Sequence, residues 1–165
     1  MAIRNPHALK ALLPAGQRLL GLDLGEKTIG VAISDPGLTV ASPIDTVRRT
    51  KFTEDVKQLA KMIQGREVGG IIVGLPINMD GTQGPRCQSV RHFAENLGKR
   101  ADLLGIEPRI TFWDERMSTV AVQRLMISEA DLTRAKRAQS VDKMAAAYIL
   151  QGALDALNKQ KPDPS

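Results

Sequence analysis

The sequence has few of the residues that bind soft metals or stack on exposed bases. It contains one cysteine, two histidines, one Trp, one Tyr and three Phe. A single cysteine excludes an internal disulfide and is consistent with a reducing cytoplasm, and one cysteine with two histidines is too few for a zinc cluster. With so few aromatic rings, binding of single strands by base stacking is not expected. No apolar run approaches the roughly 20 residues that a membrane-spanning helix needs.

The charge of the chain points to a class of partner. The 23 Lys and Arg residues exceed the 18 Asp and Glu residues, which leaves a net charge of +5. This excess favours a polyanionic partner, although composition alone leaves a basic protein without nucleic acid equally open. If the partner is nucleic acid, contacts to phosphate, sugar and duplex shape should dominate. A bound metal would need oxygen ligands, which indicates a hard cation such as Mg²⁺ or Mn²⁺.

Hydrophobic periodicity and turn residues predict one α/β domain over residues 17–157, between a flexible N-terminal extension (1–16) and a flexible tail (158–165). Strands are expected at residues 18–24, 28–35, 38–48, 69–74 and 109–115, and helices at 52–64, 85–104, 119–130 and 140–157. Helices connect the later strands, which should therefore be parallel. The result is a five-stranded mixed sheet with helices on both faces.

Asp23 is the least ordinary residue of the first strand. It stands between Leu22 and Leu24 in an apolar segment, where a buried carboxylate is costly unless its charge is compensated. Asp23 is therefore either a hydrogen-bonded structural residue or a ligand of a cation. Gly25 follows directly and would let the turn pass close to a substrate backbone.

Other carboxylates stand at a strand end and a helix start, where open α/β sheets place their sites. Asp114 and Glu115 end the fifth strand, and Asp142 is expected in the first turn of the last helix, behind an N-cap at Ser140. Each has a structural alternative. Asp142 could simply favour the positive end of the helix dipole, and Asp114 or Glu115 could pair with Arg116. Neighbouring residues of a regular strand face opposite sides, so only one of Asp114 and Glu115 can face a shared metal.

Four ordered motifs resemble those of the YqgF family: GLDLGEKTIGVAISD, IIVGLPINMDGT, FWDERMST and SVDKMAAAYIL. The resemblance covers roughly residues 18–157. The family consists of ribonuclease H-like proteins that are related to Holliday junction resolvases and proposed to process the 5′ end of pre-16S rRNA. It implies a ribonuclease H-like domain with a metal-binding carboxylate site.

Matched motif by motif, the resemblance implies that Asp23, Glu115 and Asp142 are catalytic residues and ligands of Mg²⁺ or Mn²⁺, with Glu115 preferred to Asp114. Phosphodiester hydrolysis needs an activated water and a stabilised leaving oxygen, and a pair of divalent cations can provide both. No His or Ser nucleophile is then required. The charge of Asp23 would be compensated by metal.

Three further residues are candidates for substrate binding: Lys27, Asn78 and Arg116. Solvated surface charge explains Lys27 and Arg116 as simply, and turn formation explains Asn78 equally well. The segment Arg134–Lys143 is basic and is interpreted as a mobile loop beside the site, against an ordinary solvated connection.

The function expected from these features is a metal-dependent nuclease acting on structured nucleic acid in the cytoplasm. Pre-rRNA is the expected substrate, ribosomal precursor particles are possible partners, and the protein is either a monomer or a homodimer. Two alternatives stay open: a non-catalytic RNA-binding factor for ribosome assembly, and a Holliday junction resolvase acting on DNA. An actin-like ATPase is disfavoured, because that fold needs two such domains around a nucleotide.

Overall fold

The structure is a computed structural model of the whole chain. It describes residues 2–3, 6–117 and 134–159, and it describes side chains for residues 6–117 and 143–159. The predicted helix over residues 119–130 lies outside the described residues. No helix in the described part of the chain is long and apolar enough to span a bilayer.

The described strands form one mixed sheet in the order β1-β6-β5-β2-β3-β4. The five predicted strands are confirmed, and a two-residue strand, β1, is added at the edge beside β6. β2, β3 and β4 run as an antiparallel meander, while β5 and β6 run parallel to β2. The strands are β1 (Ala2–Ile3), β2 (Arg18–Leu24), β3 (Thr28–Ser34), β4 (Ala41–Arg48), β5 (Val68–Leu75) and β6 (Ile110–Asp114).

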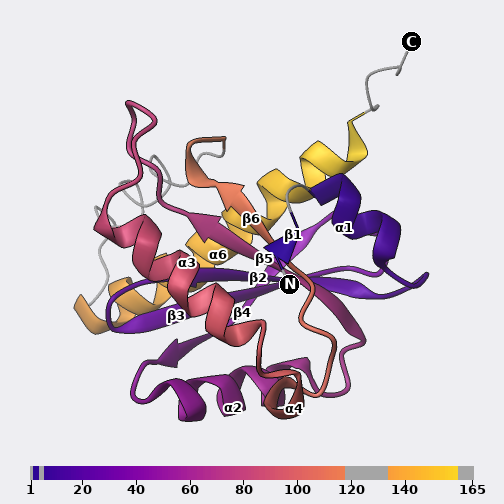
Figure 1. Cartoon of the computed structure of the whole chain (residues 1–165), viewed down its shortest axis with the longest axis horizontal. Helices are drawn as coiled ribbons and strands as arrows, with labels where there is room; N and C mark the ends of the chain where they lie inside the picture. Colours follow the sequence, from indigo (N-terminus) through magenta and orange to yellow (C-terminus); the bar gives the residue numbers. More distant parts are fainter. Residues whose placement is uncertain (1, 4–5, 118–133, 160–165) are drawn as a thin grey trace.

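Helices cover both faces of the sheet, as expected for a ribonuclease H-like domain (Figure 1). α2 (Phe52–Ile63), α3 (Pro85–Leu97) and α4 (Ala101–Leu104) lie on one face, and α1 (Pro6–Leu12) and α6 (Arg134–Asn158) lie on the other. Each face has its own apolar core. Alternate residues of β2 divide between them: Leu20, Leu22 and Leu24 pack under α2 and α3, whereas Leu19 packs under α6.

Two helix predictions are wrong in their boundaries. The single helix expected over 85–104 is two helices, α3 and α4, separated at Gly98–Arg100. The last helix begins at Arg134 rather than Ser140. Ser140 is therefore not its N-cap, Asp142 is not in its first turn, and the expected basic loop over Arg134–Lys143 is helical.

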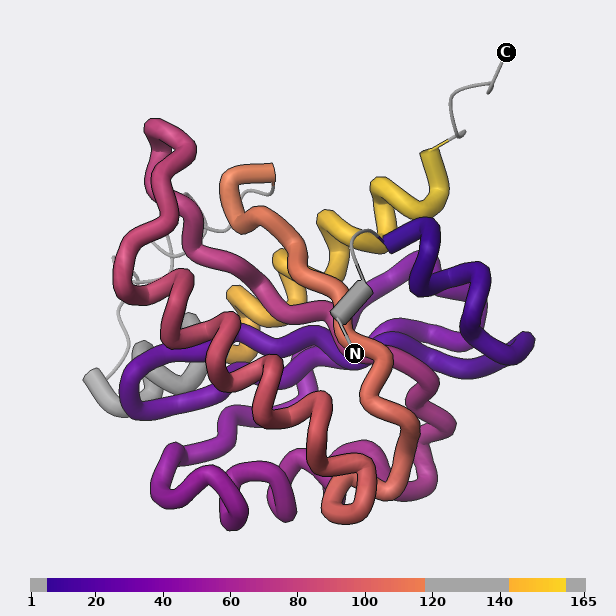
Figure 2. Tube along the Cα trace, viewed as in Figure 1, coloured from indigo at the N-terminus to yellow at the C-terminus, as the bar shows by residue number. Residues whose placement is uncertain are grey.

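The N-terminal residues contain packed structure where a flexible extension was expected. Leu9 of α1 is fully buried in the core beneath α6. It lies over Gly70 of β5, where an added Cβ would stand 2.9 Å from Leu9 Cδ1. Figure 2 shows α1 beside the C-terminal part of α6. At the other end of the chain, α6 continues to Asn158, and residues 160–165 lie outside the described residues.

Candidate active site

Asp23 lies near the end of β2 and is 3% exposed. Side chains alternate along a strand, so Asp23 faces the same side as Gly21, two residues earlier. A Cβ at Gly21 would stand 2.8 Å from Leu150 Cβ and 3.1 Å from the carbonyl oxygen of Ala146, both in α6. The Asp23 carboxylate is thus directed to the α6 face of the sheet.

Gly74 of β5 provides the space beside Asp23. The parallel register pairs Leu22 with Val73, so Gly74 is the next position of β5 beside Asp23. A Cβ on Gly74 would stand 2.5 Å from Ile149 Cδ1 and 3.1 Å from Glu115 Oε1. The missing side chain therefore lets both Glu115 and α6 approach β5. The sequence analysis assigned no role to Gly74, because a glycine within an apolar strand does not reveal which distant residues will face it.

Glu115 reaches Gly74 from the other side, because β6 pairs with β5 through Gly74 and Trp113. β6 ends at Asp114, and Glu115 begins a short 3-10 helix, η1 (Glu115–Met117). The structure therefore brings Asp23 and Glu115, which are distant in sequence, to the two sides of one glycine on the α6 face.

Asp114 has a different role from its neighbour. Arg116 donates to it from Nη2 at 2.7 Å, from Nε at 3.1 Å and from the backbone N–H at 2.9 Å. The side-chain hydrogen bond from Arg116 holds the pKa of Asp114 below its usual range. Asp114 is therefore engaged in the structural pair that the sequence allowed, while Glu115 faces Gly74.

The pairing also changes the interpretation of Arg116 and Asn78, two of the expected substrate-binding residues. Arg116 is engaged with Asp114 and lies beside the loop that follows β5, with its Nη1 atom 3.7 Å from a Cβ placed on Gly81. In that loop, Asn78 Nδ2 donates to Thr82 Oγ1 at 3.0 Å. Asn78 thus closes the turn, as its structural alternative predicted.

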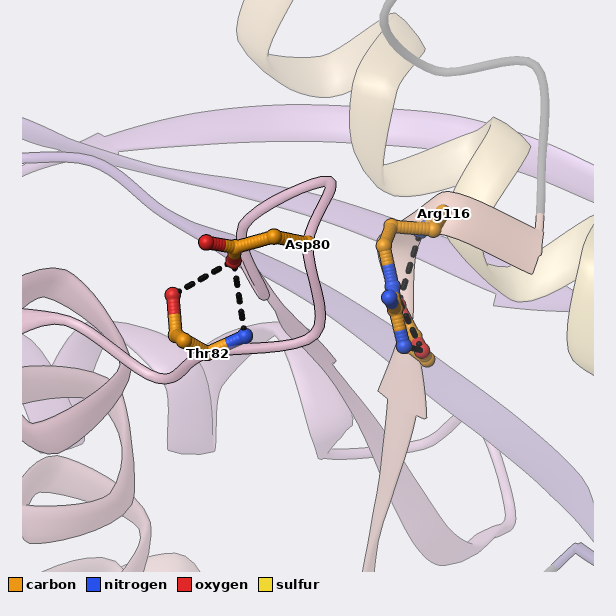
Figure 3. A network of polar contacts seen from close by, with 4 residues as sticks. Asp80, Thr82 and Arg116 are labelled. Carbon is orange, nitrogen blue, oxygen red and sulfur yellow. Dashed lines mark hydrogen bonds and ion pairs between the residues drawn. The ribbon is translucent and has the colours of Figure 1, made fainter.

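Asp80 holds the tip of the same loop. Its Oδ1 accepts hydrogen bonds from Thr82 Oγ1 at 2.6 Å and from the Thr82 backbone N–H at 2.9 Å. These bonds, with the Thr82 side chain first, lower the pKa of the exposed Asp80 carboxyl. Figure 3 shows this arrangement beside Arg116, at the end of β6. The loops after β5 and β6 therefore meet next to the carboxylates.

Lys27 is exposed in the two-residue turn between β2 and β3, where Gly25 N–H donates to the carbonyl oxygen of Thr28 at 2.8 Å. The third expected ligand, Asp142, belongs to α6, but its side chain lies outside the described ones. Among the side chains that the structure does describe, no group of three or more His, Cys, Asp and Glu residues could hold a metal ion. Two of the three expected ligands, Asp23 and Glu115, thus lie on either side of β5.

The oxygen atoms at the carboxyl ends of β2 and β6 fit a hard cation. Asp23 and Glu115 offer carboxylate oxygens, the ligands that Mg²⁺ and Mn²⁺ prefer. The absent Cβ of Gly74 is what lets the Glu115 carboxylate and Ile149 of α6 approach β5 here. Because Asp23 is almost fully buried, a nearby cation would offset the desolvation of its charge.

Comparison with known families identifies the chain. The profile of the RuvX family, described as "Holliday junction resolvase", matches residues 17–156. The chain belongs to this family. The match confirms the family resemblance carried by the four motifs and covers nearly the same range as the predicted domain.

The chain is similar to curated relatives over most of their length. The chain is 62% identical to a protein of Rhodospirillum centenum over 99% of this chain and 87% of that protein, which is named "Putative pre-16S rRNA nuclease". A protein of the same name from Phenylobacterium zucineum is 58% identical over 95% of this chain and 98% of the relative.

Among solved structures, the chain is similar to a Thermus thermophilus RuvC in complex with a Holliday junction substrate. That likeness has a TM-score of 0.49 at 15% identity and covers 85% of this chain and 94% of the RuvC chain. A Fowlpox virus resolvase in complex with junction DNA has a TM-score of 0.47 at 12% identity, over 87% and 100% of the two chains.

Proposed function

We propose that the protein is a divalent-metal-dependent nuclease that cleaves phosphodiester bonds of structured nucleic acid at Asp23, Glu115 and Asp142. The observation that carries the proposal is the placement of Asp23 and Glu115 on either side of Gly74, on one face of the sheet. Two carboxylates brought to either side of one glycine offer the oxygen ligands that a hard cation prefers. The expected compartment is the cytoplasm, where RNA precursors are processed.

Helix periodicity supports Asp142 as the third ligand. Residues four apart share a helix face, so Asp142 is expected on the same side of α6 as Ala146 and Leu150. These two residues are buried against β2 at Gly21. One helical turn toward the N-terminus of α6 from Ala146 corresponds to about two residues along the strand, from Gly21 to Asp23.

The direction of α6 is consistent with this assignment. Asn158, at the C-terminal end of the helix, donates to the carbonyl oxygen of Leu38, in the loop after β3. The end of β3 lies beside the beginning of β2, because Ile33 pairs with Leu20. α6 therefore runs antiparallel to β2, and its N-terminal half extends toward the strand end that carries Asp23.

Each group would have a distinct task. Asp23, Glu115 and Asp142 would hold one or two Mg²⁺ or Mn²⁺ ions, which supply activation of water and stabilisation of the leaving oxygen when bound. The burial of Asp23 in the sheet fixes its carboxylate without further ordering. The ion pair of Asp114 with Arg116 holds the start of η1, and with it the backbone of Glu115.

The substrate that we propose is the 5′ region of precursor 16S rRNA, in line with the name of the curated relatives. The description of the matching family favours a second candidate, the four-way DNA junction. Both substrates are polyanions with duplex arms, which suits a chain with a net charge of +5. The two candidates share the reaction and differ in the polynucleotide.

The decisive experiment incubates the purified protein with a precursor 16S rRNA fragment or a four-way DNA junction, with Mg²⁺ or Mn²⁺ and with EDTA. Asp23→Asn should reduce cleavage by more than the roughly 10–100-fold typical of residues that only support metal ligands. The exposed Glu95 provides the control, because Glu95→Gln makes the same change of charge away from the site. Cleavage that survives Asp23→Asn would contradict the proposal.

Metal binding can be measured separately by thermal unfolding. At a Mn²⁺ concentration of 100 times Kd, bound metal should stabilise the protein by about 2.7 kcal/mol, and Asp23→Asn should remove the effect. For a chain of this size, that corresponds to a rise in Tm of roughly 5–10 °C. RNA binding without either cleavage or stabilisation by metal would instead identify a non-catalytic assembly factor.

A further inference from the structure

The hairpin that carries Asp23 has a second polar surface on the opposite face of the sheet. A cavity of about 50 Å³ lies there, between the turn after β2, the residues before α2 and the first turns of α3. Leu24, which belongs to the core under α2 and α3, lines this cavity, whereas Asp23 faces α6. Since roughly 10–15 Å³ accommodates one water molecule, the cavity has room for a tetrahedral oxyanion.

Two hydrogen bonds and a ring contact hold Arg49 at this cavity. Its Nη1 atom donates to the carbonyl oxygen of Gly25 at 2.6 Å, and its backbone N–H donates to the carbonyl oxygen of Lys27 at 2.8 Å. The guanidinium carbon lies 5.5 Å from the centre of the Phe93 ring, within the range of a cation–π contact. A guanidinium has five N–H donors, so Arg49 keeps donors available after binding Gly25.

Arg86 lines the same cavity from the second position of α3, together with Ser89. Glu26 also lines it. Within the residues that the structure describes, the salt bridges are three, and none involves Arg49, Arg86 or Glu26. Two guanidinium groups therefore share one small cavity, and no carboxylate among the described side chains forms a salt bridge with either.

Three more cations are near the two arginines in the sequence or in the strand register. Lys27 is exposed at the tip of the hairpin, the exposed Arg48 pairs in register with Thr28, and the exposed Lys51 precedes α2. A concentration of positive charge around a cavity of this kind attracts polyanions.

We propose that Arg49 and Arg86 bind a backbone phosphate of the polynucleotide, as a second contact on the α3 side of the β2–β3 hairpin. The inference rests on the proposed function and adds the path of the substrate. The bound polynucleotide strand crosses the tip of the β2–β3 hairpin, from the face of the sheet that carries Asp23 to the face covered by α3. Guanidinium groups recognise phosphate by paired hydrogen bonds. Such contacts position the substrate without reading its sequence.

The test compares Arg86→Gln with Lys99→Gln. Arg86 and Lys99 are both exposed, one in the first turn of α3 and one just past its C-terminal end, and both substitutions remove one positive charge. The probes are a fluorescein-labelled RNA stem-loop with a 5′ extension and a labelled four-way DNA junction, measured by fluorescence anisotropy in EDTA. Arg86→Gln should weaken binding by about tenfold at low salt. It should also reduce the slope of log K against log salt by about 0.9.

Arg49→Gln needs a second readout, because it also removes the bond to Gly25. It should lower both the Tm and the affinity, whereas Arg86→Gln should lower the affinity alone. If both arginines hold one phosphate, the double variant should lose less affinity than the product of the two single losses, because contacts to a shared group are not additive. Independent losses would place the arginines on separate phosphates and overturn the shared site.

The outcomes separate this inference from the proposed nuclease. Equal binding by wild type, Arg86→Gln and Lys99→Gln would overturn the phosphate site and leave metal-dependent cleavage untouched. Weaker binding by Arg86→Gln in a protein that never cleaves would support the site and contradict the nuclease. A wild-type protein that binds neither probe in EDTA would overturn the phosphate site, and cleavage with Mg²⁺ or Mn²⁺ would decide the nuclease separately.

Discussion

Glu115 Oε1 lies 3.1 Å from the point that a Cβ atom on Gly74 would occupy. Asp23 flanks the same glycine from β2, on the other side of β5. Because residues on neighbouring strands are about 4.8 Å apart, the glycine sets how closely the two carboxylates can share a ligand. The separation of the Asp23 and Glu115 carboxylates therefore depends on Gly74, a residue with no functional group of its own.

Gly74→Ala should abolish most cleavage while the protein still folds. The added methyl would meet Ile149 as well as Glu115, and overpacking of this kind costs about 1–3 kcal/mol. The matched control is Gly21→Ala, whose Cβ would press on Leu150 of the same helix, two residues before Asp23. Tm and cleavage should be measured for both. Equal losses of activity at matched stability would show that Gly74 acts through α6 packing alone.

Glu115→Gln and Asp114→Asn should distinguish the metal-binding role proposed for Glu115 from the structural role of Asp114. Glu115→Gln should remove both cleavage and stabilisation by Mn²⁺. Asp114→Asn should keep the stabilisation by metal and lower the Tm by a few degrees, because the Asp114–Arg116 pair is partly exposed and worth about 1 kcal/mol or less. Cleavage assays and unfolding with and without Mn²⁺ check both. The reverse pattern would make Asp114 the ligand.

Asp35 should make stability depend on pH in the acid range. Backbone N–H groups of Val40 and Thr39 and the Thr39 hydroxyl lower the pKa of Asp35 from 3.8 to about 2. A carboxyl with a lowered folded-state pKa contributes stability above its unfolded pKa and loses it as the pH falls through the folded one.

Asp35→Asn should therefore lower the Tm at neutral pH, by roughly 2–4 °C for a loss of about 1 kcal/mol near the surface. The difference from wild type should close as the pH falls from about 4 toward 2, since Asn does not titrate. Thermal unfolding across that range measures it. A difference that stays constant with pH would mean that the carboxylate charge contributes nothing.

Leu9→Ala should show whether the N-terminal helix belongs to the folded domain. Leu9 is fully buried beneath α6, and truncation of a buried leucine costs about 2–5 kcal/mol. Leu12, 54% exposed in the same helix, is the control, and Leu12→Ala should change stability by no more than about 0.5 kcal/mol. Chemical unfolding gives both values. If both substitutions have equal, small effects on stability, residues 1–16 would be a flexible extension, as the sequence predicts.

Local elements could be predicted well because their signals are local. The hairpin of β2 and β3 lies where two short, mainly apolar segments flank the turn at Glu26 and Lys27. The break between α3 and α4 was missed because Leu97 and Leu104, on either side of it, are both buried and two helical turns apart. A helical period therefore continues across Gly98. The early start of α6 is not predicted because residues 134–139 (RAKRAQ) contain only alanines as apolar residues, and helix formers without a large apolar face leave a weak periodic signal.

The sequence by itself determined five of the six strands, the order of the motifs and the candidates Asp23 and Asp114 or Glu115, because short apolar segments, turn residues and acids at strand ends are local properties. Only the tertiary structure decided that Glu115 faces Gly74 while Asp114 pairs with Arg116. It also decided that Arg49 and Arg86 meet at one cavity. The physical reason is sheet register: hydrogen bonding between β2, β5 and β6 sets which distant residues become neighbours, and no short stretch of sequence contains that pairing.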